Sequence, residues 1–130
     1  MGVCFDTANV FASGYDLRNS ETCHATFQQF DETIDLERLK VFHLNDSKSD
    51  LGSRLDRHEH IGKGLLGLET FRLLINDVRF EKHPMVLETP GGMDFDKVNL
   101  KLLRSLKKRN RKGDIYGIKI RRRRDFKNGD

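Results

Sequence analysis

Residues 39–64 decide the fold, because they join an apolar run to a long polar loop. They begin with Leu39-Lys-Val-Phe-His43-Leu, continue through Asn45-Asp-Ser-Lys48 and Gly52-Ser-Arg-Leu-Asp56-Arg-His58, and end at Gly62-Lys-Gly64. A short apolar run of this kind is typical of a strand that is buried on both faces, as in a parallel sheet. The stretch from His43 to Gly64 holds three good metal ligands, His43, Asp56 and His58, and its glycines and serines let a backbone approach a phosphate. The stretch therefore predicts a strand followed by a loop that carries chemistry.

The same order of elements recurs on both sides of this stretch. Apolar runs predict strands at 2–6, 39–44 and 84–88, and periodic apolar residues predict helices at 20–35, 68–78 and 94–106. Ser20 and Asp94 are the expected N-caps of the first and third helices. The side chains expected to face inward are Cys23, Phe27, Phe30, Ile34, Leu68, Phe71, Leu74 or Ile75, Val78, Phe95, Val98, Leu102 and Leu106. Residues 7–19 are expected to form a loop, and residues 115–120 could add a short strand. Alternation of this kind indicates an α/β fold with a parallel sheet and right-handed crossovers.

Charge divides the chain into two regions. Residues 104–130 hold 12 of the 24 Lys and Arg residues but only 3 of the 20 Asp and Glu residues. We therefore expect residues 1–107 to form the folded domain and the basic tail, 108–130, to be disordered. The Arg121–Arg124 run can also serve as a nuclear-import or nucleic-acid patch.

Composition excludes a membrane protein, since 34% of the residues are charged and no apolar run approaches the roughly 20 residues of a span. The first residues lack the basic and apolar regions of a signal peptide. We expect an intracellular protein whose two cysteines, Cys4 and Cys23, are buried and reduced.

An acid or a histidine stands at the end of each predicted strand: Asp6, His43 and Glu88. Strand ends of parallel α/β folds converge on one face, so these groups are expected to share a centre. Asp56 and His58 are two residues apart, which places both side chains on one side of an extended segment. The five residues suit Zn, Mn or Fe, and their crowded carboxylates favour more than one metal ion.

Each residue also has a structural alternative. Asp6 could be an N-cap, His43 a hydrogen-bonded histidine, and Glu88 a salt-bridge partner. His24, His60 and His83 lack the strand-end position and are expected at the surface. The metal-site interpretation depends on the conjunction of three strand ends with one Asp-x-His loop.

Six segments carry a resemblance to a known family. They are Gly2-Val-Cys-Phe-Asp-Thr7, Gly14-Tyr-Asp-Leu-Arg18, His43-Leu-Asn-Asp-Ser-Lys48, Gly52-Ser-Arg-Leu-Asp-Arg-His-Glu59, Ile61-Gly-Lys-Gly64 and Leu87-Glu-Thr-Pro90. Together, over residues 2–107, they resemble the endonuclease IV family of apurinic/apyrimidinic endonucleases.

The resemblance implies a TIM barrel that holds three zinc ions and cleaves double-stranded DNA on the 5′ side of abasic sites, in base excision repair. It implies that Asp6, His43 and Glu88 bind one zinc ion, and that Asp56 and His58 are two of the three ligands of another. These five would be the catalytic and metal-binding residues of a phosphodiester hydrolase. Four more residues stand where a phosphate could be contacted, although the resemblance carries no specific role to them: Asn45, Ser47, Lys48 and Arg57.

The sequence departs from the family pattern in two ways. Asn9 stands where the family motif has a histidine ligand, and an amide oxygen is a poorer zinc ligand than imidazole. The chain supplies only three β/α units, the last three of an eight-unit barrel. We therefore expect fewer zinc ions, and a second chain could complete the barrel.

Two rival interpretations remain. The chain could be a non-catalytic remnant that binds DNA through its basic tail, with the steep salt dependence of phosphate contacts. It could also be a fragment of a barrel sugar isomerase, which shares the scaffold.

Overall fold

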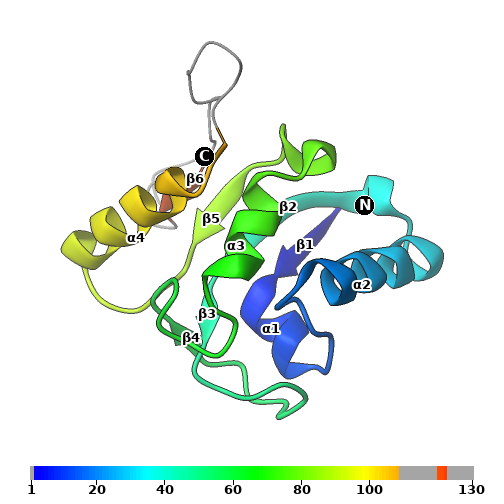
Figure 1. Cartoon of the computed structure of the whole chain (residues 1–130), viewed down its shortest axis with the longest axis horizontal. Coiled ribbons are helices and arrows are strands. Elements are labelled where there is room, and N and C mark those ends of the chain that lie inside the picture. Colours follow the sequence, from blue (N-terminus) through cyan, green and yellow to red (C-terminus); the bar gives the residue numbers. More distant parts are fainter. Residues whose placement is uncertain (1, 109–119, 123–130) are drawn as a thin grey trace.

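The computed structural model describes residues 2–108 and 120–122. Its main sheet has four parallel strands in the order β1 (Val3–Asp6), β2 (Leu39–Leu44), β5 (Met85–Leu87) and β6 (Ile120–Arg122). Helices α2 (Ser20–Thr33), α3 (Leu68–Ile75) and α4 (Met93–Ser105) follow β1, β2 and β5 along the chain, as Figure 1 shows. A parallel sheet whose strands alternate with helices is the α/β arrangement that the sequence predicted. Among residues 2–108 and 120–122, none of the helices combines the length and the apolar character that a membrane span requires.

Short elements fill the connections. Helix α1 (Thr7–Ala12) follows β1 directly, 3₁₀ turns lie at Leu36–Arg38 and Val78–Phe80, and β3 (Asp46–Ser47) pairs antiparallel with β4 (His58–Glu59). The prediction of a loop over 7–19 is therefore wrong in its first half. Helix α1 forms because Asp6 acts as its N-cap and accepts the Asn9 N–H.

Aromatic residues of the sheet and of α2 form the centre of the core. Phe5 of β1 stacks on Phe27 of α2 with ring centroids 4.9 Å apart, and Phe42 of β2 lies 4.8 Å from Phe80. Because side chains alternate along a strand, this pattern turns Asp6 and His43 to the opposite face of the sheet. Core packing and site thus share the same strands.

Several boundaries and faces differ from the predictions. Asn19, not Ser20, caps α2 through the Thr22 N–H, and Gly92, not Asp94, is the N-cap residue of α4. Ile34 and Leu68 are exposed, and Val78 is 82% exposed because the chain leaves α3 after Ile75 and turns into a 3₁₀ helix.

The buried face of α4 is also not the predicted one. Phe95 and Val98 are exposed, whereas Asp96, Asn99, Leu100 and Leu103 are buried. Asn99 faces inward because its amide accepts the Ile61 N–H and donates to Thr89.

Cys4 is exposed, contrary to the prediction, while Cys23 is buried, and both thiols are free. The predicted basic tail and the predicted strand at 115–120 lie mostly outside the described residues. Ile120–Arg122 form the fourth strand, paired with β5.

Candidate metal centre

The ends of β1, β2 and β5 bring Asp6, His43 and Glu88 together. Asp6 is the last residue of β1 and is paired in register with His43, which in turn pairs with Val86 of β5. The His43 Nδ1 atom contacts the Glu88 carboxylate and lies 3.8 Å from Asp6 Oδ2. Parallel pairing therefore places these three side chains side by side, as the sequence predicted.

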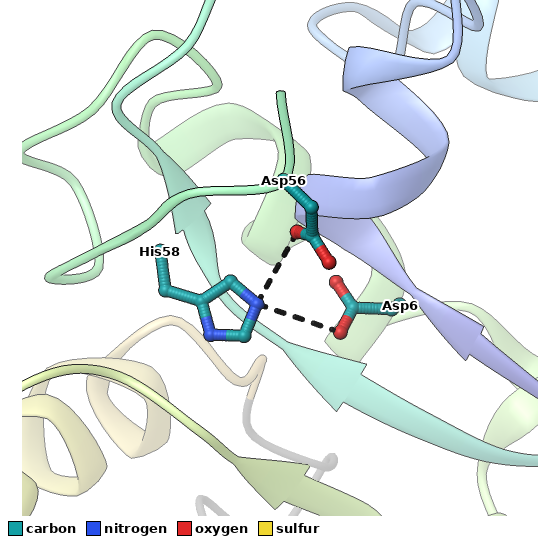
Figure 2. Close-up of side chains that lie close together, drawn as sticks. All are labelled: Asp6, Asp56 and His58. Atoms are coloured by element: carbon teal, nitrogen blue, oxygen red, sulfur yellow. Dashed lines mark ion pairs between the residues drawn. The ribbon is translucent and has the colours of Figure 1, made fainter. Parts of the chain in front are cut away.

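The loop before β4 adds Asp56 to the same place, and His58, the first residue of β4, joins it. His58 Nε2 lies 3.4 Å from Asp56 Oδ1 and 3.8 Å from Asp6 Oδ2, as Figure 2 shows. The other ring nitrogen, Nδ1, is 2.9 Å from the Glu88 carbonyl oxygen. Because a carbonyl only accepts, Nδ1 carries a hydrogen, and the ring is held with Nε2 facing the two acids.

The five residues form two ligand groups that share Asp6. Donor atoms of Asp6, Asp56 and His58 lie within 4.8 Å of one another, and so do those of Asp6, His43 and Glu88. Each group offers one imidazole and two carboxylates, which are the donor types that zinc accepts. The donor set thus fits the zinc ions that the resemblance implies.

Asp6 is the electrostatic centre of this arrangement. Burial raises the pKa of Asp6. Three contacts outweigh burial and hold the pKa below its ordinary value: the hydrogen bond with His43, the hydrogen bond from the Asn9 N–H, and the electrostatic interaction with His58. Asp6 is therefore a carboxylate over a wider pH range than an isolated aspartate.

The four residues assigned to phosphate contact divide into two pairs. Lys48 and Arg57 are exposed and line an open pocket together with Asp56, His58 and Glu88. Asn45 and Ser47 are 0% exposed. Asn45 and Ser47 therefore do not offer their side chains to a phosphate in this structure, because both side chains make hydrogen bonds inside the protein.

The glycine loop also has a different role from the one expected. Its N–H groups at Gly62, Leu66 and Gly67 point to the buried carboxylate of Asp46 rather than outward. Gly64 lies so close that a Cβ atom there would be 2.4 Å from Asp46 Oδ1. Asp46 thus folds the loop onto the end of β2, a role that its acidic type alone did not predict.

The remaining histidines lie outside both ligand groups, but two of them are not surface residues. His60 is half-buried, stacks on Phe95 and contacts Asn99, while His83 is half-buried with Nε2 2.8 Å from the Leu39 carbonyl oxygen. His24 is exposed, as expected.

Comparison with known proteins places the chain in a family. Residues 1–109 match the family model described as "Xylose isomerase-like TIM barrel". The probable endonuclease 4 of Chloroflexus aggregans is 58% identical over 108 residues, and that of Geobacter sulfurreducens is 56% identical over 109 residues. These matches cover 82% of this chain but 38% and 37% of the relatives, so the chain spans less than two-fifths of their length.

Solved structures give the same result. The crystal structure of endonuclease IV from Thermus thermophilus matches with a TM-score of 0.73 and 37% identity, over 82% of this chain and 38% of that one. The resemblance to the endonuclease IV family is thereby confirmed, and the chain belongs to the xylose isomerase-like TIM barrel family.

Proposed function

We propose that this chain is part of a zinc-dependent endonuclease that hydrolyses the phosphodiester bond 5′ to abasic sites in double-stranded DNA, in base excision repair. The observation that carries the proposal is the meeting of two ligand groups around Asp6. The names of its relatives, probable endonuclease 4 and endonuclease IV, support a nuclease.

Zinc bound by these groups would supply a Lewis acid and an activated water for hydrolysis of the phosphodiester. The protein's own residues hold that centre in place. The Glu88 carbonyl fixes the His58 ring, and Asp6 remains ionised between His43 and His58. Lys48 and Arg57 line the pocket, where their positive charge would attract a phosphate group.

The complete activity is proposed to need the rest of the barrel. A closed barrel has eight strands, and the described residues contribute four to the parallel sheet. We propose that a second chain supplies the missing units, and that this chain by itself binds fewer than three zinc ions. Asn9, at a position where the resemblance implies a histidine, is the reason to expect a weaker site for the ion that Asp56 and His58 would share.

The test is incision of a labelled duplex that contains one synthetic abasic site, with zinc present. The chain is assayed alone, and it is also assayed after mixing with the part of the Chloroflexus aggregans relative that has no counterpart in this chain. The matched variants are Asp56→Ala, which removes a proposed ligand, and Asp50→Ala, which removes an exposed carboxylate from the same loop.

We expect the mixture to cut on the 5′ side of the abasic site. Asp56→Ala should lower the rate by at least about 100-fold, because loss of a mere hydrogen-bond partner of a metal ligand already costs about 10–100-fold, whereas Asp50→Ala should not change it. A mixture that cuts no faster than the added segment alone, or equally fast with Asp56→Ala, would refute the proposal.

The basic region supports a second candidate, a non-catalytic DNA-binding remnant. Residues 104–130 carry half of all Lys and Arg residues, and such charge binds any duplex with an affinity that falls steeply with salt. Removal of residues 107–130 should then abolish binding to intact and abasic duplexes alike. If the shortened chain still prefers abasic DNA, the body and not the tail recognises the substrate.

A further inference from the structure

The side chain of Asn45 connects two of the proposed metal ligands. Asn45 follows β2 directly and is 0% exposed. Its Nδ2 group donates to Asp6 Oδ2 at 3.3 Å, and its Oδ1 atom accepts the backbone N–H of Glu88 at 3.0 Å. One amide thus joins the ends of β1 and β5 across β2.

The backbone of Asn45 is itself held in place by Thr7, at the start of α1. The Thr7 hydroxyl donates to the Asn45 carbonyl at 2.6 Å and accepts the Asn45 N–H at 2.9 Å. Thr7 is also 0% exposed. Because the backbone N–H and carbonyl of Asn45 are both held by Thr7, the side-chain amide has little freedom to turn away from Asp6 and Glu88.

The amide of Asn45 contacts the carboxylate oxygen of Asp6 that faces both histidines. Asp6 Oδ2 is the oxygen that lies 3.8 Å from both His43 Nδ1 and His58 Nε2, while Oδ1 accepts the Asn9 N–H. The two donors together fix the rotation of the carboxylate. Since Asp6 belongs to both ligand groups, a single amide acts on both.

Only a side chain with a donor and an acceptor at this spacing can fill the position. Aspartate would turn an oxygen toward the Asp6 carboxylate, and leucine would leave the Glu88 N–H without its acceptor. Neither would hold Asp6 in its present orientation.

We propose that Asn45 is a positioning residue of the metal centre. Its amide orients Asp6 between the two histidines and fixes the backbone of Glu88 relative to Asp6. The proposal rests on the proposed function, because it assumes that Asp6, His43, Asp56, His58 and Glu88 bind metal. Hydrogen bonds to metal ligands of this kind typically change metal affinity 10–100-fold.

The experiment measures zinc affinity of the full chain by competition with a chelating dye, together with the visible absorption spectrum of bound Co²⁺. The variants are Asn45→Leu and the smaller Asn45→Ala, whose cavity can admit a water. The matched control is Asn99→Leu. Asn99 is 3% exposed and also uses both ends of its amide, toward Ile61 and Thr89, but it contacts no proposed ligand.

We expect both Asn45 variants to bind zinc about 10–100-fold more weakly and to change the Co²⁺ spectrum. Asn99→Leu should lose stability to urea but keep the affinity and spectrum of the original chain. Circular dichroism establishes which variants are folded. If Asn45→Leu is unfolded, the zinc affinity and Co²⁺ spectrum of Asn45→Ala test the proposal.

Two outcomes would overturn the inference, and they differ. If the original chain binds zinc and the folded Asn45 variants bind it equally well, Asn45 does not position the centre and the proposed function stands. If the original chain binds neither zinc nor Co²⁺, the assignment of the five ligands fails and this inference fails with it.

Discussion

Replacing Asp46 with alanine should be among the most destabilising changes in the polar loop. The Asp46 carboxylate is completely buried and accepts N–H groups of Gly62 and Leu66, each at 2.9 Å. A hydrogen bond to a charged group contributes about 1.5–3 kcal/mol, and a buried donor that loses its acceptor bears a similar cost. These two long-range bonds alone give an expected loss of about 3–6 kcal/mol in the free energy of unfolding.

The assay is urea unfolding followed by circular dichroism, on the original chain, Asp46→Ala and Asp50→Ala. Asp50 lies in the same loop but is exposed, and its carboxylate accepts the N–H of the neighbouring Leu51. With a slope of about 1.5 kcal/mol per molar urea, the midpoint of Asp46→Ala should fall by about 2–4 M. A domain at the low end of the usual stability range of about 5–15 kcal/mol would be close to unfolding.

Asp50→Ala should move the midpoint by less than about 0.5 M, the usual result at an exposed site. The reasoning is refuted if the midpoints of Asp46→Ala and Asp50→Ala agree. In that case the loop would be held by contacts other than the Asp46 carboxylate.

Four further predictions concern packing and chemistry away from the proposed ligands. Gly64→Ala should lower the urea midpoint by more than 1 M, about 2 kcal/mol of unfolding free energy, because its Cβ would meet Asp46 and the Ser47 carbonyl. The control Gly92→Ala, whose Cβ would meet open space, should not lower the midpoint by this amount. Equal midpoints for the two variants would contradict this prediction. Burial raises the pKa of the Cys23 thiol to about 11, so iodoacetamide at pH 8 should label Cys23 in urea but not in buffer, as peptide mass spectrometry can show. The same raised pKa favours the folded state at low pH, and this contribution should be lost as the pH rises from 9.0 through about 11. Phe27→Ala should cost about 3–5 kcal/mol of unfolding free energy by urea titration, because it empties the centre of the aromatic core; a loss below 1 kcal/mol would contradict this.

Strands and the ligands at their ends were predictable because both depend on local patterns. The apolar run before His43 has the length and composition of a buried strand, and parallel pairing then determines which residues become neighbours. Asp6, His43 and Glu88 could therefore be assigned to one edge of the sheet without knowledge of the distances between them.

Caps and faces were less predictable because they depend on competition between neighbouring residues. Asn19 and Ser20 are both good N-caps, and the Thr22 N–H decides between them. On α4, Phe95 and Val98 have the apolar pattern of an inner face, but Asn99 turns inward to meet Ile61 and Thr89. Such polar contacts join distant segments and have no periodic signal in the sequence.

The interior of the polar loop was the least predictable part. Asn45 and Ser47 look like surface groups that could meet a phosphate, yet both are completely buried. The signal that could have separated them from Lys48 is their position directly after a buried strand, where the chain is still covered by the core.

The sharing of Asp6 by two ligand groups has a thermodynamic consequence. Two sites with one carboxylate in common cannot fill independently, because the first cation changes both the local charge and the orientation of the shared group. By reciprocity, whatever coupling free energy the first site exerts on the second, the second exerts equally on the first. Cooperativity between the two proposed metal sites would therefore follow from a cluster in which Asp6 serves both histidines.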